Sequence, residues 1–327
     1  MSSNVPLTVG ILGLGQIAHG YDDPAGQAIS THIKACLAEP RLRIAWVSDI
    51  DNALAVDVND QWNLGASVVV PDNASCHAVD VVCIATPDDT HVQWVDRFLA
   101  STPKLILCEK PLAASTKQAQ DLLSKVQATE CKLVINFMRR WIPGVSTWLS
   151  AAARGGFGAP VEAQLTYCRG LRHNACHGLD LIGAAFGCDV VSARKSTDGF
   201  DDFEATDLTV SATLGLRGRA GPVPVSITGV DGRLRNVFDV DIIFETSRLR
   251  VWNEDGIRAQ ISGVDSQSSY EFHDKPVRHM QYVWKNIADT LMDGAPLLCA
   301  STETLPGMRL VDAVANASPQ ATDDPNV

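Results

Sequence analysis

Hydrophobic residues in the first 137 positions gather into short, nearly continuous runs, separated by segments with helical spacing. Such runs are typical of strands buried on both faces of a sheet. They cover residues 7–13, 42–49, 66–70, 79–86, 104–110 and 131–137. The segment after Ser115 places Leu122, Leu123 and Val126 on one helical stripe. Strands that alternate with helices predict a parallel, doubly wound α/β sheet.

From about residue 160 the runs follow one another quickly, and polar and apolar residues partly alternate within them. These runs cover residues 160–168, 207–216, 222–230, 237–246, 247–253 and 257–262. Turn-forming residues separate them, which predicts a second, mainly antiparallel sheet in an α+β domain. A strong helical stripe follows at residues 280–291. We expect domains at 1–130 and 131–316, with the last helices able to pack back on the first domain, and a polar tail at 317–327.

Composition and charge narrow the possible functions. The chain has 327 residues, enough for two domains, and a net charge of −11. That charge argues against binding nucleic acid or anionic membranes. No run approaches the roughly 18 apolar residues of a membrane span, and the start lacks a secretory signal pattern. The cysteines are scattered and form no CxxC motif, which fits free thiols in a reducing compartment and predicts a cytoplasmic protein.

A glycine motif of the form GxGxxA follows the first predicted strand at residues 13–18. Gly13 permits a tight turn, and Gly15 lets the main chain approach a pyrophosphate. Gln16 and Ile17 would open a helix whose N-terminal amides favour phosphate. The motif therefore predicts a dinucleotide-binding turn.

Asp49 ends the second predicted strand, where a carboxylate can accept the hydroxyl groups of an adenosine ribose. About ten extra residues around 20–31 lengthen the first crossover beyond the usual spacing. Asp49 lies beside Asp51, and an acidic pair would repel a 2′-phosphate, so NAD is favoured over NADP. Alternatively, Asp49 is only a turn residue at the end of a strand.

Three further segments follow predicted strands: 84–91 (IATPDDTH), 109–111 (EKP) and 136–141 (NFMRRW). With the glycine motif, their order resembles the Gfo/Idh/MocA family of NAD(P)-dependent sugar and cyclitol oxidoreductases. The likeness covers nearly the whole chain, and the ATPxxxH motif followed by EKP is its specific part. The resemblance implies an N-terminal Rossmann domain and a second domain for substrate binding and oligomerisation.

The resemblance also implies roles for individual residues. Lys110 would point at the reacting carbinol and tune its proton transfer, a task that suits a partly desolvated lysine. Thr86, Pro87 and His91 would line the nicotinamide ribose and ring. Glu109, in the same motif as Lys110, is a further expected cofactor residue.

Basic residues gather near these motifs in an otherwise acidic chain: Arg139, Arg140, Arg169 and Arg172. They could bind a phosphate, a carboxylate or a nucleotide-sugar diphosphate of the substrate. Alternatively, Arg139 and Arg140 pair with carboxylates of their own domain and contact the cofactor. Arg140 is expected at the cofactor and Arg172 at the substrate.

The segment 169–181 holds the expected substrate site. Many family members carry a D-x-x-x-H-x-x-D pattern there; His177 and Asp180 match it, while His173 replaces the first acid with Asn174 beside it. In a helix these residues share one face. His177 could hold or deprotonate the substrate hydroxyl, Asn174 or His173 could bind a neighbouring hydroxyl, and Asp180 could orient His177. Whether Lys110 or His177 is the principal base stays open.

Cys168, His173, Cys176 and His177 could in principle form a zinc set, because thiolates and imidazoles suit that ion. Adjacent Cys176 and His177 would point in different directions from a helix, however, and Cys168 belongs to a predicted strand. We therefore expect no metal.

Together these features predict an NAD-dependent oxidoreductase that transfers hydride between nicotinamide and a secondary alcohol of a sugar or sugar derivative, phosphorylated or nucleotide-linked substrates included. Two other functions stay open: a non-catalytic NAD-binding regulator, and a redox-neutral NAD-using glycosidase of the same fold. One face of the second sheet needs covering, which predicts a homodimer or homotetramer.

Overall fold

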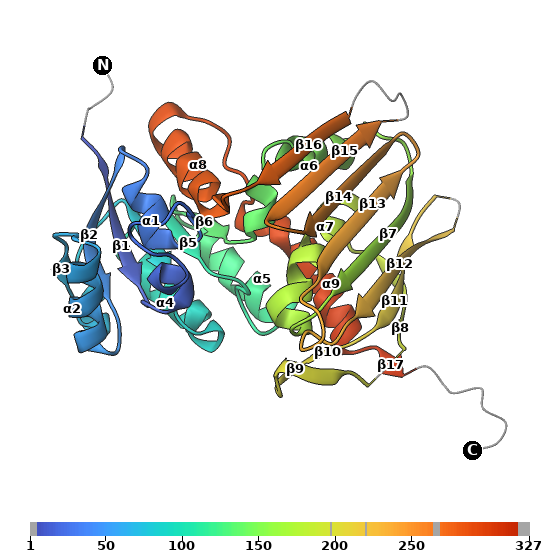
Figure 1. The fold of residues 1–327 in the computed structure, drawn as a ribbon, viewed down its shortest axis with the longest axis horizontal. Helices are drawn as coiled ribbons and strands as arrows, with labels where there is room; N and C mark the ends of the chain where they lie inside the picture. The colour runs from blue at the N-terminus through green and yellow to red at the C-terminus, as the bar shows by residue number, and fades with distance from the viewer. Residues whose placement is uncertain (1–4, 197, 220, 264–268, 320–327) are drawn as a thin grey trace. The chain divides into compact units, whose positions relative to one another are not determined.

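The computed structural model describes residues 5–196, 198–219, 221–263 and 269–319, and it divides the chain into two compact units (Figure 1). Unit 1 comprises Met1–Ile142 and Asp274–Glu303, and unit 2 comprises Pro143–His273 and Thr304–Val327. Across the described residues, no helix is both long enough and apolar enough to cross a membrane.

Unit 1 contains a parallel sheet whose strands, within the described residues, follow the order β3-β2-β1-β4-β5-β6 (Figure 1). The strands are β1 (Leu7–Leu12), β2 (Leu42–Ser48), β3 (Ser67–Val68), β4 (Val81–Ile84), β5 (Leu105–Cys108) and β6 (Lys132–Ile135). Each falls within a predicted apolar run, and β4 and β5 are buried at every position. This order is that of a Rossmann domain, which binds ligands beyond the carboxyl ends of its strands.

Helices and short helical turns connect these strands or follow the last of them. They are η1 (Gln16–Gly20), α1 (His32–Leu37), α2 (Asn52–Gln61), α3 (Pro71–Ala74), η2 (Asp88–Thr90), α4 (His91–Leu99), α5 (Thr116–Gln127), η3 (Met138–Trp141), α8 (His279–Asp293) and η5 (Ser301–Thr304). In α5 the predicted stripe is buried, and the Ser115 hydroxyl caps the helix by accepting the Gln118 N–H at 3.3 Å. Helix α8 packs on α1 and η3.

Unit 2 contains a mainly antiparallel sheet of nine described strands in the order β16-β15-β14-β13-β7-β12-β11-β8-β17. The strands are β7 (Pro160–Tyr167), β8 (Val190–Lys195), β11 (Ala212–Arg217), β12 (Pro222–Gly229), β13 (Phe238–Phe244), β14 (Ser247–Asn253), β15 (Ile257–Gly263), β16 (Ser269–Asp274) and β17 (Ser318–Pro319). A small hairpin of β9 (Phe200–Glu204) and β10 (Asp207–Thr209) stands apart from it. The α/β fold class expected from the sequence is confirmed.

The helices of unit 2 are α6 (Val145–Ala153), η4 (Leu171–Ala175), α7 (Cys176–Phe186) and α9 (Leu305–Ala315). Helix α7 packs on β7, β13 and α9, and α9 also packs on β8 and β11 (Figure 1). The two helices approach closely, because a Cβ at Gly183 would lie 2.5 Å from the main-chain nitrogen of Gly307. This packing fixes the position of α7, which carries part of the expected substrate site.

The border between the units differs from the expected one near residue 130. Strand β6 pairs in parallel with β5, with Leu133 opposite Ile106, so this strand belongs to the sheet of unit 1. Residues 274–303, which include α8, also belong to unit 1, whereas α9 belongs to unit 2. In the expected tail, Ser318–Pro319 forms β17 beside β8, and residues 320–327 lie outside the described residues.

Candidate active site

Two glycines shape the turn after β1 in different ways. Gly13 has a φ of +87°, and a Cβ there would lie 2.5 Å from the carbonyl oxygen of Ala85, so the position requires glycine. A Cβ at Gly15 would instead point into open space, with nothing within 4 Å. An accessible main chain at Gly15 is what a pyrophosphate needs, and this glycine turn therefore fits a dinucleotide.

The chain after the glycine turn differs from the long helix that the motif predicts. Gln16 and Ile17 begin the short π-helix η1, and α1 starts only at His32 because residues 20–31 are inserted. Asp49 follows β2, and its carboxylate accepts the N–H groups of Leu14 at 2.7 Å and Asp51 at 3.0 Å. Asp49 thus serves as a turn residue that ties β2 to the glycine turn, and its contact with a ribose stays a prediction.

Glu109 and Lys110 directly follow β5. The Glu109 carboxylate is 8% exposed, and its Oε1 lies 2.9 Å from His32 Nε2 and accepts the Asn136 amide at 2.6 Å. Its Oε2 accepts the main-chain N–H of Lys110 at 3.2 Å. Burial opposes the charge, but the hydrogen bonds from His32 and Asn136 keep the pKa of Glu109 below its usual value. Glu109 is therefore a buried carboxylate that shapes the main chain at Lys110.

His91 is fully buried at the start of α4. Its Nδ1 lies 2.7 Å from the Pro111 carbonyl oxygen, and its Nε2 lies 2.9 Å from the Thr86 carbonyl oxygen. Carbonyl oxygens only accept hydrogen bonds, so both ring nitrogens must donate and the imidazole is protonated. Burial opposes this charge, but the Cys108 sulfur and the two carbonyls outweigh it and raise the pKa of His91 to about 10. His91 thus joins the loops that follow β4 and β5.

The other predicted cofactor residues of unit 1 lie on the same loops or on η3. Pro87 is exposed, and the Thr86 hydroxyl accepts the Thr90 hydroxyl at 2.7 Å. Arg140 is 5% exposed; its guanidinium donates to the Glu303 carbonyl at 2.8 Å and lies 3.6 Å from the Glu303 carboxylate. The expected pairing of Arg140 within its own domain is therefore present, while its contact with a cofactor stays a prediction.

The predicted substrate residues share one continuous helical segment of unit 2, in which η4 leads directly into α7. Arg172, His173 and Asn174 lie on η4, and His177 and Asp180 lie on α7. His177 is 7% exposed and Asp180 is 1% exposed. Asp180 faces α9 closely, since a Cβ at Gly307 would lie 2.5 Å from the Asp180 Cα. Asp180 thus lies where α7 and α9 meet, and its expected role in orienting His177 stays a prediction.

Two of these side chains already bind other parts of unit 2. The Asn174 amide donates to the Cys168 carbonyl oxygen at 2.8 Å and so stabilises the turn between β7 and η4. The Arg172 guanidinium lies 3.7 Å from the Asp312 carboxylate on α9. Their roles toward a substrate stay predictions.

The hairpin β9–β10 holds this segment through residues that the sequence analysis did not single out. The Asp207 carboxylate accepts the main-chain N–H groups of Arg172 at 2.9 Å and His173 at 2.7 Å. Asp202 accepts the Arg169 N–H at 2.7 Å. The Phe203 ring stacks on the His173 ring with 4.1 Å between centroids. The hairpin thus sets both the start of η4 and the orientation of His173.

Arg169 adopts a conformation that is unusual for a residue with a side chain. Its φ is +64°, and Gly170 follows with a φ of +84°. Non-glycine residues in this region carry strain, which is common near functional sites. The guanidinium lies 4.6 Å from the Phe203 ring centroid, so Arg169 and His173 both pack on Phe203.

The predicted residues therefore form two groups, one in each unit. Unit 1 holds all the predicted cofactor residues together with Lys110, and unit 2 holds all the other predicted substrate residues together with His177. Because the two groups belong to different units, a meeting of Lys110 and His177 on one ligand stays a prediction.

The two cysteines of the possible zinc set form hydrogen bonds with other residues of unit 2. Cys168 Sγ accepts the Val237 N–H at 3.3 Å and lies 3.4 Å from the Asn236 side-chain oxygen, while Cys176 Sγ donates to the His173 carbonyl at 3.7 Å. Among the described residues, no group of three or more His, Cys, Asp or Glu side chains is placed to hold a metal ion.

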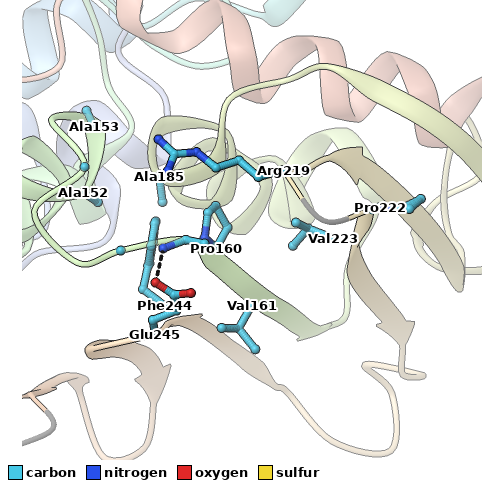
Figure 2. Close-up of a pocket in the computed structure, with 15 residues that line it drawn as sticks. Ala152, Ala153, Pro160, Val161, Ala185, Arg219, Pro222, Val223, Phe244 and Glu245 are labelled. Carbon is cyan, nitrogen blue, oxygen red and sulfur yellow. Dashed lines mark hydrogen bonds between the residues drawn. The ribbon is translucent and has the colours of Figure 1, made fainter.

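A pocket of about 590 Å³ lies in unit 2, between the end of α6 and the strands β7, β12 and β13 (Figure 2). Small and apolar residues line most of it, and Glu245 accepts the Ala159 N–H at 2.8 Å at its wall. Its described lining contains none of the residues predicted to bind substrate or cofactor. The pocket is therefore separate from the candidate active site.

Residues 7–137 match the family model GFO_IDH_MocA, described as an oxidoreductase family with an NAD-binding Rossmann fold. The matched segment contains the glycine turn, the loop after β4 and the EKP motif. The residues of this segment therefore match the Gfo/Idh/MocA family of NAD-binding oxidoreductases, as the motifs predicted.

Several dehydrogenases are similar to this chain in sequence. Inositol 2-dehydrogenase of Rhizobium meliloti is 31% identical over 36% of this chain and 36% of that protein. Inositol 2-dehydrogenase of Rubrobacter xylanophilus is 33% identical over 47% of this chain and 42% of that protein. D-xylose 1-dehydrogenase (NADP(+)) 2 of Haloferax volcanii is 26% identical over 76% and 73% of the two chains. The matches thus span well under half of the two inositol dehydrogenases.

Solved structures resemble the chain over almost its full length. UDP-N-acetylglucosamine 3-dehydrogenase from Acidithiobacillus ferrooxidans has a TM-score of 0.74 at 18% identity, covering 96% of this chain and 98% of that one. An oxidoreductase from Agrobacterium radiobacter, in complex with NAD+, L-tartaric acid and magnesium, has a TM-score of 0.69 at 16% identity, covering 95% and 96%. At these identities the likeness establishes the fold.

Proposed function

We propose that this protein is an NAD-dependent oxidoreductase that transfers hydride between the nicotinamide and a secondary alcohol of a sugar or sugar derivative. The main support is the arrangement in unit 1. There the carboxyl end of β5 carries Lys110 on a main chain fixed by Glu109, in the same sheet as a glycine turn that is open to a pyrophosphate. The family match and the sugar and inositol dehydrogenases among the relatives support the reaction class.

The residues of the chain would divide the work between binding and proton transfer. NAD, when bound, supplies the acceptor for the hydride. The glycine turn and Asp49 would hold the dinucleotide, and Lys110 would exchange the proton of the reacting hydroxyl through its Nζ. His177 would hold or deprotonate the same hydroxyl from the other unit, with His173 and Asn174 beside it.

Asp49 supports NAD as the preferred cofactor. Its carboxylate lies at the end of β2, tied to Leu14, where a second negative charge from a 2′-phosphate would be repelled. An Asp49→Ser variant should therefore lose NAD affinity and reduce its discrimination against NADP. The ratio of the two dissociation constants, measured by titration, tests this preference.

Lys110→Ala carries the main test of the reaction. The variant should lower kcat by about 10²–10⁴-fold with the best sugar of a panel that includes inositols, aldoses, phosphorylated sugars and nucleotide sugars, while NAD still binds. Lys104→Ala is the matched control, because Lys104 pairs with Asp80 before the start of β5. Turnover that survives in Lys110→Ala would contradict the proposed role.

The same panel separates the other two functions. NAD binding without oxidation of any sugar would favour a regulator. A cofactor that stays bound through gel filtration, while a glycosidic bond is cleaved without net reduction, would favour a redox-neutral glycosidase.

The proposal includes a cytoplasmic homodimer or homotetramer. This assembly and location are supported by the nine described cysteines, all free thiols, and by the sheet of unit 2, in which partly exposed residues alternate with buried ones along β13. Mass measurement by light scattering in solution would test the assembly, and a monomer at micromolar concentration would contradict it.

A further inference from the structure

A chain of buried hydrogen bonds links helix α8 to the EKP motif through His32, a residue with no role in the proposed reaction so far. Trp284 on α8 donates its indole N–H to His32 Nδ1 at 3.2 Å, and the two rings meet edge to face with 6.0 Å between centroids. His32 Nε2 lies 2.9 Å from Glu109 Oε1. Both His32 and Trp284 are 0% exposed.

The donors and acceptors in these hydrogen bonds fix the protonation state and the tautomer of the His32 imidazole. An indole N–H can only donate, so His32 Nδ1 must accept and carries no proton. The other nitrogen, Nε2, must then carry the proton that it donates to the Glu109 carboxylate. The ring is therefore neutral and in one tautomer, and Trp284 selects that tautomer.

Glu109 passes this constraint to the main chain of Lys110. One carboxylate oxygen is held by His32 and Asn136, and the other accepts the Lys110 N–H at 3.2 Å. On the other side of Lys110, the Pro111 carbonyl accepts from His91 at 2.7 Å. The backbone that carries the Lys110 side chain is thus held on both sides by a buried histidine.

The inserted loop, residues 20–31, is joined by hydrogen bonds to the segments before His32 and before α8. Asp22 Oδ2 accepts the N–H of Ser30 at 2.7 Å and both the N–H and the hydroxyl of Thr31, at 2.8 and 2.7 Å. The Ile29 N–H donates to the Val277 carbonyl at 2.8 Å, just before α8. The loop therefore sets the residue immediately before His32 and joins the start of α1 to the start of α8.

We propose that His32 is a positioning residue for Lys110: it holds Glu109 in the orientation that fixes the Lys110 main chain, and the inserted loop and Trp284 hold His32. The expected effect of His32 on turnover rests on the proposed function. Its effect on the position of Lys110 does not, and that effect can be measured without substrate.

Two substitutions of His32 distinguish a role in positioning Lys110 from a role in packing the core. A glutamine amide reaches the place of Nε2, so His32→Gln keeps a donor for Glu109. An asparagine amide reaches only the place of Nδ1, so His32→Asn keeps an acceptor for Trp284 and loses the bond to Glu109. Cys36→Ala is the matched control, because Cys36 lies on the same helix, is 1% exposed and is buried as deeply.

The first measurement needs no substrate. In wild-type protein, the long-range proton–nitrogen NMR spectrum should show His32 as the neutral Nε2–H tautomer, and Trp284→Phe should allow the other tautomer. Reductive methylation of Lys110 with ¹³C, followed by NMR, should give the same methyl resonance in wild type, His32→Gln and Cys36→Ala, and a shifted one in His32→Asn. An unshifted resonance in His32→Asn, or a protonated His32 in wild type near neutral pH, would overturn the proposal.

The second measurement uses the enzyme with NAD and its best substrate. His32→Asn should lower kcat about 10- to 100-fold, because it alters the orientation of the Lys110 side chain. The dissociation constant of NAD should change little. His32→Gln should recover most of the loss, and Cys36→Ala should lower the melting temperature without lowering kcat. Equal losses in all three variants would show a merely structural role. If wild type oxidises no sugar, the proposed function fails while the NMR result still decides the positioning.

Discussion

The segment around Lys110 in unit 1 and the segment around His173 in unit 2 are held in place by different chemistry. At Lys110, buried side chains bind one another and the loops: His32 and Asn136 hold Glu109, and His91 bridges two carbonyls. At His173, a carboxylate on a distant hairpin binds main-chain N–H groups of the segment, and Phe203 packs on the ring.

The two segments should therefore respond differently to pH and to mutation. A network of histidines depends on which ring nitrogen carries a proton, so it is sensitive to pH and to the exact donor at each position. A carboxylate that accepts main-chain N–H groups requires only that the acid be ionised. We therefore expect the stability of the Lys110 segment to fall as the pH rises above about 6.5, where the proton on folded His91 contributes less. The His173 segment should respond mainly to loss of its carboxylates.

The largest expected effect is that of Asp207→Ala. The variant leaves the N–H groups of Arg172 and His173 without their carboxylate acceptor, and charge-assisted hydrogen bonds of this kind are worth about 1.5–3 kcal/mol each. The free energy of unfolding should fall by about 3–5 kcal/mol, measured by urea denaturation. Asp201→Ala, which removes an exposed acid from the same hairpin, is the control and should change stability by less than about 0.5 kcal/mol. Equal losses in the two variants would contradict the role of Asp207.

The same contrast explains what could be predicted from the sequence. Apolar runs located all six strands of the described Rossmann sheet, because strands buried on both faces leave that pattern. Strand ends and motifs also predicted that Glu109 and Lys110 follow a strand of this sheet, and both residues come directly after β5. The second sheet was predicted as a class, but β8, β16 and the hairpin strand β9 were missed because their residues show no clear apolar face.

The partners of the site residues could not be predicted, because they come from distant positions. His32 lies 77 residues from Glu109, and Asp207 lies 34 residues from His173. Asp207 also falls within a run that reads as a strand, so nothing in its neighbourhood marks it as the acceptor for η4. The same holds for Trp284, which lies within the helical stripe predicted at residues 280–291 and also donates to His32 Nδ1.

The second-largest expected effect is that of His91→Leu, which disrupts the histidine contacts beside Lys110 in unit 1. The change leaves the partly buried carbonyls of Thr86 and Pro111 without the His91 donors and should lower the free energy of unfolding by about 2–3 kcal/mol at pH 6. His77→Leu, at an exposed histidine of the same unit, is the control and should have little effect.

The loss in His91→Leu should also depend on pH. The folded-state pKa of His91 is about 10, above the ordinary value of 6.5, so its contribution is full below pH 6.5 and is lost as the pH rises toward 10. Unfolding curves of wild type and variant at pH 6 and pH 9 should therefore converge at the higher pH. A difference between them that stays constant would show that the buried ring is not protonated.

The smallest expected effect lies on the acid side and involves His279, at the start of α8. Burial first, and then the positive charge of Arg139, lower its pKa from 6.5 to about 4. Between these values the unfolded chain binds a proton that the folded protein does not, so stability falls as the pH drops, by up to about 1.4 kcal/mol per pH unit. From pH 6.5 to pH 5 the loss should be roughly 1.5 kcal/mol, and His279→Gln should abolish it. Asp202 in unit 2 titrates below its usual 3.8 and so adds nothing in this window. An unchanged slope in His279→Gln would therefore show that the acid sensitivity in this window comes from groups other than His279.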